Sequence, residues 1–290
     1  MKEKVKEIRV TSSGTLMDIL TYELKDLTKK KIKSFLRYDM VYVNGKIVKL
    51  PNYKVIERDI VKVYFSKKTI LDIDIKVLYE DKDIIVVDKP TNLLTISNEN
   101  EKELTLFRLV SEHIKKENKK NRLFVVHRLD KDTSGVVLFS KNLKLKEEMQ
   151  KNWNDIVRLR EYKAIAHGKV PKEMHVKSYL SMNHFKRMYE TKNKEKGKLA
   201  ISNFYNKKYK NGLSFLEIDI ETGRRNQIRV HLSDKGYPIV GDKVYGKNSD
   251  LDKRSRLMLH ASKLELLDPR TKRVISFESE LPKEFKKLLK

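Results

Sequence analysis

The stretch that decides how this chain folds lies between residues 123 and 139 and reads, in turn, Leu123-Phe124-Val125-Val126, His127-Arg128-Leu129-Asp130-Lys131-Asp132-Thr133-Ser134-Gly135 and Val136-Val137-Leu138-Phe139. Its two ends are short runs of β-branched and aromatic residues, and a Thr-Ser-Gly turn precedes the second run, which is typical of buried strands. We therefore expect Asp130 at the end of a strand, in a tight connection. An acid and a base, His127, enclosed by apolar strands make this connection a candidate site for chemistry.

Composition narrows the class of partner. The chain has 290 residues, a formal net charge of +25 and no cysteine. This length fits one or two domains, and we expect two. A positive charge of this size is typical of a surface that binds a polyanion. Nucleic acid is the first candidate partner, and an acidic membrane surface is the alternative. A genome-wide excess of lysine would explain the charge without any partner. No apolar segment is long enough to span a bilayer or to act as a signal peptide, so we expect a soluble, cytoplasmic protein. Without cysteine there is no disulfide, and the seven histidines lack metal-ligand spacing, so no metal is expected.

Residues 1–65 have the pattern of a small mixed α/β unit. Residues 27–37 predict a short helix capped by Thr28, with Ile32, Phe35 and Leu36 buried and a basic ridge on the opposite face. Residues 41–48 alternate around Asn44-Gly45, which predicts a hairpin, and residues 60–65 predict a closing strand. The ridge and hairpin carry the candidate RNA-binding residues Lys29, Lys30, Lys33, Arg37 and Lys46; a plain solvated face is the alternative interpretation.

Residues 66–74 have the composition of a linker, and residues 75–290 predict a second, larger domain. Strands outnumber helices in this domain, so we expect an α+β fold on a mixed, largely antiparallel β-sheet with flanking helices. Helices are predicted at 105–116 and 143–153; strands are predicted at 75–78, 84–87, 164–166, 214–220, 228–232 and 258–264, with an extended segment at 93–96.

A buried Asp130 needs a cation to stay ionised, and Arg128 and Arg229 are the candidates. If residues 228–232 form a strand, Gln227, Arg229 and His231 share one polar face. A structural ion pair between two loops is the simpler interpretation of Asp130. Tyr162 is either a core aromatic or, in a site that handles a base flipped out of RNA, the face on which the base stacks.

Six ordered blocks in residues 77–290 together resemble the RluA-type (RluC/RluD-like) pseudouridine synthases. These blocks are residues 77–90, 127–135, 162–164, 222–231, 236–242 and 259–261. The basic helix followed by Val43-Asn44-Gly45-Lys46 resembles the S4-like (alpha-L) RNA-binding domain. The resemblance implies a pseudouridine synthase fold preceded by an S4-like domain.

The resemblance also implies the roles of the site residues. Asp130 is then the catalytic aspartate that starts cleavage of the glycosidic bond, after which the uracil rotates and is rejoined through a ring carbon. Arg229 pairs with Asp130 and Tyr162 stacks on the uracil. Arg128 fills the gap that the flipped nucleotide leaves, and Leu259 lines the pocket. No cofactor and no metal are implied.

Two positions depart from the family pattern, and several functions stay open. Asn92 stands where glycine is frequent and is expected to keep the turn, because asparagine tolerates positive φ. Asn226 stands where histidine is frequent and can keep a hydrogen bond. The expected substrate is large-subunit (23S) ribosomal RNA, with transfer RNA as the alternative. A non-catalytic RNA-binding or ribosome-assembly factor, and a hydrolase that releases uracil, are the competing classes; a hydrolase would need a second carboxylate, and Asp132 is the one nearby.

Overall fold

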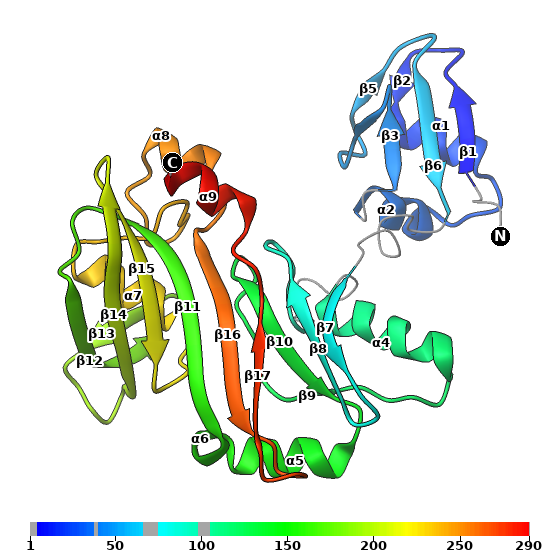
Figure 1. The fold of residues 1–290 in the computed structure, drawn as a ribbon. Helices are drawn as coiled ribbons and strands as arrows, with labels where there is room; N and C mark the ends of the chain where they lie inside the picture. Colours follow the sequence, from blue (N-terminus) through cyan, green and yellow to red (C-terminus); the bar gives the residue numbers. More distant parts are fainter. Residues whose placement is uncertain (1–4, 38–39, 66–74, 98–104, 290) are drawn as a thin grey trace. The chain divides into compact units, whose positions relative to one another are not determined.

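The chain forms two compact units, Met1–Asp74 and Ile75–Lys290, in a computed structural model (Figure 1). The structure describes residues 5–37, 40–65, 75–97 and 105–289. The predicted linker at 66–74 lies outside these residues. Each unit has its own hydrophobic core, so each is described by itself.

The first unit packs two helices against a small antiparallel sheet. The strands of this sheet lie in the order β1-β6-β3-β4, and β2 pairs with β5. The elements are β1 (Val5–Arg9), β2 (Gly14–Thr15), α1 (Leu16–Glu23), α2 (Lys29–Arg37), β3 (Val41–Val43), β4 (Lys46–Ile47), β5 (Lys54–Val55) and β6 (Ile60–Tyr64). The predicted helix, hairpin and closing strand are confirmed as α2, β3–β4 and β6.

Local sequence explains α2 and the hairpin. The Thr28 hydroxyl accepts a hydrogen bond from the Lys31 backbone N–H at 3.2 Å, as a helix cap does. Three apolar residues of α2 are buried, while its five cationic side chains are exposed and its nine residues include no acid. In the hairpin, Asn44 and Gly45 both adopt positive φ, 49° and 79°. Lys46 begins β4, and its side chain lies outside the described part of the structure.

The second unit is built on one large sheet with the strand order β13-β12-β14-β15-β11-β16-β10-β8-β7. Strand β17 also pairs with β16, and β9 pairs with β10. Among the described strands of this sheet, only the β10–β16 pair is parallel, which confirms the mixed, largely antiparallel prediction. The strands are β7 (Lys76–Glu80), β8 (Ile84–Lys89), β9 (Phe124–Val125), β10 (Ser134–Ser140), β11 (Val157–His167), β12 (Glu173–Met182), β13 (Met188–Thr191), β14 (Lys198–Lys210), β15 (Leu213–Ile220), β16 (Leu259–Leu267) and β17 (Val274–Glu278).

Helices flank this sheet, and the predictions at 105–116 and 143–153 are confirmed as α4 and as α5 followed by α6. The helices are α4 (Leu106–Glu117), α5 (Leu143–Lys151), α6 (Trp153–Ile156), α7 (Gln227–Asp234), α8 (Asp250–Arg254) and α9 (Lys283–Leu289). Across the described residues, none of these helices is long and apolar enough to cross a membrane.

Two predictions for this unit are wrong. Residues 228–232 are the helix α7 and not a strand, so Gln227, Arg229 and His231 do not share a strand face. Residues 93–96 form no strand; Leu94 makes a single bridge to Thr105. The physical reason for the first error is that Gln227 to Leu232 are all buried, so the helix has no polar face and its sequence lacks helical periodicity.

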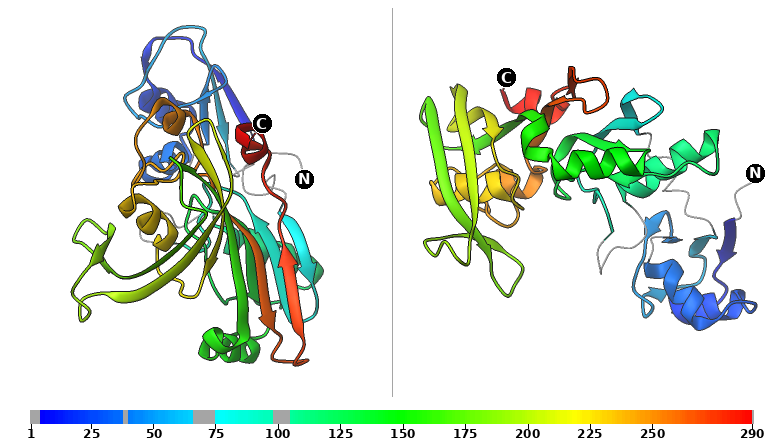
Figure 2. Two further views of the ribbon diagram at one scale, coloured as in Figure 1. Left: turned by 60° about the vertical axis from the view of Figure 1, so that its left-hand side comes forward. Right: turned by 90° about the horizontal axis from the view of Figure 1, so that it is seen from below.

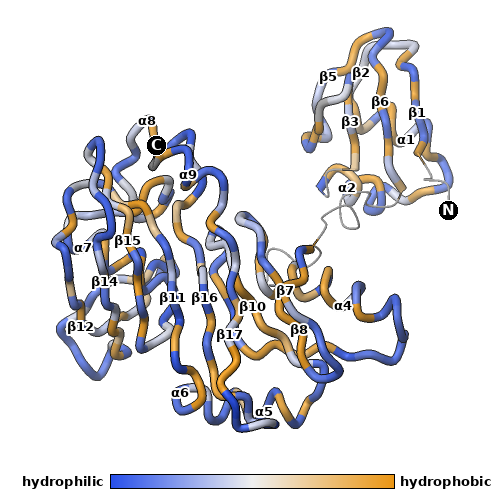
Figure 3. Tube along the Cα trace, in the orientation of Figure 1, coloured by the Kyte–Doolittle hydropathy of each residue, from blue (hydrophilic) through white to orange (hydrophobic). Residues whose placement is uncertain are grey.

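The centre of the sheet positions the candidate site. Apolar residues are concentrated on β8 and β10, whereas β12 alternates between polar and apolar positions (Figure 3). The sheet is strongly twisted, so its β12–β14 end turns away from its β7–β8 end (Figure 2). At the start of β10, Gly135 has φ 118°, and a Cβ there would lie 2.1 Å from the Ala261 carbonyl oxygen of β16. Only glycine therefore allows the parallel β10–β16 contact that brings the Asp130 connection beside β16.

Candidate active site

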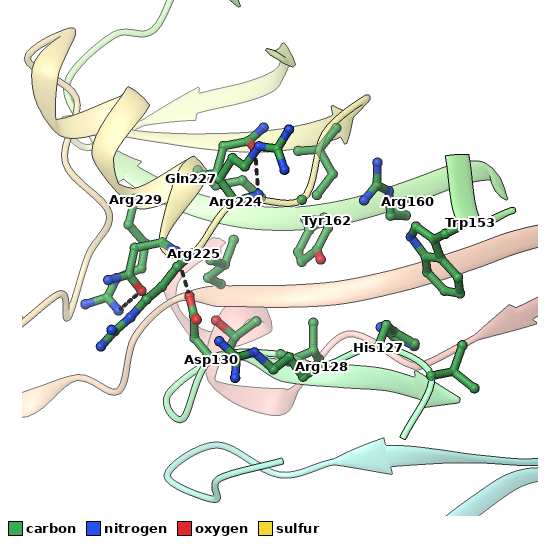
Figure 4. A pocket seen from close by; sticks show the side chains of 18 of the residues that line it. His127, Arg128, Asp130, Trp153, Arg160, Tyr162, Arg224, Arg225, Gln227 and Arg229 are labelled. Carbon is green, nitrogen blue, oxygen red and sulfur yellow. Dashed lines mark hydrogen bonds between the residues drawn. The ribbon is translucent and has the colours of Figure 1, made fainter. Parts of the chain in front are cut away.

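A cavity of about 460 Å³ lies between the β9–β10 connection, β11, β16 and the segment that enters α7. Five residues predicted for the chemistry line it together, although they are far apart in sequence: Arg128, Asp130, Tyr162, Arg229 and Leu259. Figure 4 shows Asp130 directed toward the start of α7 and the Tyr162 ring projecting from β11 into the same space. The structure thus brings these predicted site residues to one place.

The turn that carries Asp130 is fixed by the segment after β8. The Thr95 hydroxyl donates to the Leu129 carbonyl at 2.8 Å and accepts from the Leu129 N–H at 3.1 Å. The Thr91 hydroxyl donates to the Asp132 carbonyl at 2.7 Å. Within the turn, the Thr133 N–H donates to the Asp130 carbonyl at 3.2 Å. Asn92, between the two threonines, has φ 60°, so the left-handed turn expected of it is present.

Lys89 fixes the same turn from the end of β8. Its side chain is fully buried, and its amine donates to the carbonyls of Pro90, Leu93 and Lys131 at 3.0, 2.7 and 3.0 Å. Burial lowers the pKa of Lys89 to about 7, against the nearby charges of Asp132 and Asp130. A buried amine with three carbonyl acceptors is a rigid anchor for the turn.

The Asp130 carboxylate is half-buried. Burial raises its pKa, and the charge of Arg229 is the strongest influence in the opposite direction, followed by the backbone N–H of Asn226. That N–H donates to Asp130 Oδ2 at 3.2 Å (Figure 4). An environment that desolvates a carboxylate and opposes this effect with nearby cations and a backbone N–H is characteristic of functional sites.

The predicted pairing of Arg229 with Asp130 needs a correction. The Arg229 guanidinium makes a two-pronged interaction with Asp242, with Nε and Nη2 each 2.7 Å from a carboxylate oxygen. No ion pair between Arg229 and Asp130 is found among the described residues, so Arg229 acts on Asp130 as a neighbouring charge. Both partners of the Arg229–Asp242 pair are buried, and a buried guanidinium takes the partner that satisfies two of its donors at once. Burial raises the pKa of Asp242, but the hydrogen bonds and charge of Arg229, together with the backbone N–H groups of Tyr245 and Val244, outweigh burial and hold that pKa below its usual value.

Three aromatic rings, those of His127, Trp153 and Tyr162, line part of the cavity. Burial raises the pKa of Tyr162 to about 12, so this side chain offers a neutral ring at physiological pH. The His127 ring stacks on Trp153 with centroids 5.1 Å apart, and its Nε2 accepts the Leu138 N–H at 3.0 Å. Burial lowers the pKa of His127 to about 4. His127 is therefore a neutral wall residue held by the backbone, and not the base that its place beside Asp130 suggested.

Arg128 is exposed and lies at the boundary between two cavities. The second cavity, of about 430 Å³, shares with the first Arg128, Leu129, Asp130, Arg225, Asn226 and Arg229. An exposed guanidinium at this boundary can contact RNA outside the enclosed part of the site.

Sequence reasoning gave no role to Lys89 and Asp242, and it named Asn226 as a departure from the family pattern that can keep a hydrogen bond. Lys89 and Asp242 lie inside sequence blocks that pointed to the family, but which atoms they contact depends on the fold. For the described part of the chain, no group of three or more histidine, cysteine or acidic residues is arranged to hold a metal ion.

Comparison with known proteins identifies the family. A family model described as RNA pseudouridylate synthase matches residues 83–234. The chain belongs to this family. It is an RluA/RluD-type synthase, an enzyme that isomerises uridine to pseudouridine in RNA.

Relatives of this synthase cover its whole length. It is 32% identical over 100% of its chain and 98% of the relative to "Ribosomal large subunit pseudouridine synthase D" of Buchnera aphidicola subsp. Baizongia pistaciae. It is 30% identical to the "Uncharacterized RNA pseudouridine synthase YhcT" of Bacillus subtilis, over 94% of its own chain and 91% of that protein. Among solved structures, human RNA pseudouridylate synthase domain containing 4 aligns with TM-score 0.61 at 22% identity, over 73% of this chain and 90% of that one, which shows the shared fold.

Proposed function

We propose that this synthase isomerises specific uridines in large-subunit ribosomal RNA and that Asp130 is its catalytic carboxylate. The observation that carries the proposal is the position of Asp130, which lies in one cavity with Tyr162, Arg229 and Leu259 while Arg229 and the Asn226 N–H oppose the effect of its burial. The ribosomal target is supported by the names of the relatives, several of which are ribosomal large subunit pseudouridine synthases.

The reaction breaks the bond between uracil N1 and ribose C1′, turns the ring, forms a bond between C5 and C1′ and moves one proton from C5 to N1. Asp130 acts at the nucleotide that is flipped into the cavity and starts the cleavage. Tyr162 stacks on the uracil, and Leu259 closes the apolar wall. An enclosed pocket is needed because the detached ring must neither leave nor meet water before it is rejoined.

Two basic regions bind the rest of the RNA in this proposal. Arg128 occupies the place that the flipped nucleotide vacates. The first unit acts as an S4-like domain, with the exposed residues Lys29, Lys30, Lys33 and Arg37 of α2, together with Lys46, contacting phosphates.

Pseudouridine mapping in total RNA tests the proposal. Deleting the gene should remove one or more pseudouridines from large-subunit ribosomal RNA, and the wild-type gene should restore them. Asp130→Asn should restore none, since losing a catalytic carboxylate costs at least about 100-fold in rate. Asp155→Asn, which removes an exposed acid from α6, is the control and should restore every site.

The outcomes separate the parts of the proposal. If the lost sites lie in transfer RNA, the ribosomal target is wrong while the catalytic assignment stands. If Asp130→Asn restores the sites, the catalytic assignment is wrong.

A further inference from the structure

Asn226 joins β15 to α7 in a conformation that few residues adopt. It lies directly before the first residue of the helix with φ 52° and ψ 18°, in the left-handed region. Residues other than glycine are uncommon there, and asparagine is among those that tolerate it best. The conformation is stable here because both the backbone and the side chain of Asn226 have partners.

The backbone of Asn226 contacts Asp130. Because Asn226 precedes α7, its N–H has no acceptor within the helix. The left-handed turn directs this N–H to Asp130 Oδ2 at 3.2 Å (Figure 4). It is the one hydrogen bond that the Asp130 carboxylate receives from the described residues. The backbone conformation of Asn226 therefore decides whether the carboxylate is held in a single orientation.

The side chain of Asn226 contacts the cation that acts on Asp130. Its Oδ1 accepts from Arg229 Nη1 at 3.2 Å, and its Nδ2 donates to the Tyr245 hydroxyl at 3.4 Å. The Arg229 guanidinium lies over the Tyr245 ring, 5.2 Å from its centroid. Arg229 thus has three neighbours that fix it: Asp242 on one edge, Asn226 on another and Tyr245 beneath.

We infer that Asn226 is a positioning residue that aligns Asp130 and Arg229 with each other. Its backbone N–H orients the carboxylate, and its side chain fixes the third donor of the guanidinium. The inference rests on the proposed catalytic role of Asp130. Asparagine at this position supplies both the left-handed turn and an acceptor for Arg229.

The charges around Asp130 set the expected pH dependence. Arg229 from α7 and Arg225, Arg128 and the Asn226 N–H all lower its pKa, whereas burial raises it. Lys89 from β8 and Tyr162 from β11 are also within electrostatic reach of Asp130. If the N–H turns away and Arg229 shifts, two of the influences that lower the pKa weaken while burial stays. The acidic limb of the rate profile should then move to higher pH.

The test measures single-turnover kinetics against pH for the full chain, with an RNA oligonucleotide that carries a mapped uridine. Asn226→Ala should lower the single-turnover rate at saturating RNA by about tenfold or more, because a small misplacement at a reacting group costs about this much or more. The RNA concentration that gives half of the maximal rate should stay within about twofold of wild type. The variant should also move the acidic limb upward by about one pH unit. Asn226→Gly, which keeps the turn and loses the side-chain contacts, should fall between wild type and Asn226→Ala. Asn226→His should keep most of the wild-type rate.

The control variant is Asn211→Ala. Asn211 also has positive φ, 51°, but it lies in the exposed turn between β14 and β15. An alanine at this position carries the same left-handed strain as an alanine at position 226, without contacting Asp130. The single-turnover rate and the pH profile of this variant should match wild type.

Two results would overturn the inference: an Asn226→Ala enzyme with the wild-type rate, or a slower one whose acidic limb has not moved. Either leaves the proposed function intact as long as wild type converts the oligonucleotide and Asp130→Asn does not. Failure of wild type to convert it counts against the proposed function itself.

Discussion

Lys89 shows how one buried residue both fixes the site and couples its stability to pH. When its amine is protonated, all three N–H donors are used by carbonyls, one of them in the turn of Asp130; the neutral amine keeps two donors and loses one of these bonds. None of these three acceptors is a carboxylate, and burial lowers the pKa of Lys89 to about 7 from 10.5. Between about pH 7 and pH 10.5, Lys89 keeps its proton in the unfolded chain but has released it in the folded protein.

The free energy of unfolding should therefore rise with pH through this window because of Lys89, by up to about 1.4 kcal/mol per pH unit. Lys89→Met removes this contribution, so the stability of the variant relative to wild type should worsen steadily from pH 7.5 to pH 9.5. Urea unfolding at three pH values in this range measures the slopes. Lys144→Met, which removes an exposed lysine of α5, is the control and should keep the wild-type slope. Equal slopes for Lys89→Met and wild type would contradict the assignment.

At the scale of elements, α7 shows what the sequence could and could not predict. The strands around Asp130, the helix α2 and its hairpin follow from periodicity and turn residues, which act locally. In contrast, the apolar Ile228, Val230 and Leu232 alternate like a strand although they are helical. Their polar neighbours are buried and satisfied by other elements; His231, for example, contacts Ser202 and Ser178. One local signal did exist: Gly236, with φ 84°, lies just past the helix, where glycine is a common stop.

The same contrast applies to the site. Asp130 and Tyr162 could be predicted because each belongs to a recognisable block of sequence. The partner of Arg229 could not, since choosing Asp242 over Asp130 depends on where α7 places the guanidinium. The Asn226 N–H could not be predicted either, because a backbone donor leaves no trace in residue type.

The Arg229–Asp242 pair should contribute to stability mainly by preventing an unpaired buried charge. Asp242→Leu leaves the Arg229 guanidinium buried without its partner and should destabilise the protein by about 3–5 kcal/mol. The double variant Arg229→Met/Asp242→Leu has no buried charge at this position and should recover about 2 kcal/mol of that loss. Chemical denaturation of the two variants gives both values. The double variant should remain inactive, since it lacks the cation beside Asp130. If the double variant is no more stable than Asp242→Leu, an unpaired buried charge is not the cause of the destabilisation.

At the scale of the whole molecule, we expect only some of the cationic residues behind the net charge of +25 to bind RNA. Helix α2 concentrates exposed cations on a unit with its own hydrophobic core, separate from the core beneath the cavity.

Replacing Lys29, Lys33 and Arg37 by glutamine should weaken RNA binding and leave the single-turnover rate at saturating RNA unchanged. Each phosphate contact that is lost reduces the slope of log affinity against log salt by about 0.7–0.9, so the loss of three contacts should flatten the slope by about 2–3. The triple variant Lys115→Gln/Lys116→Gln/Lys119→Gln removes the same charge from the exposed end of α4 and beyond, and it controls for net charge alone. Equal flattening in both triple variants would show that RNA responds to total charge, and the specific role proposed for α2 would then be wrong.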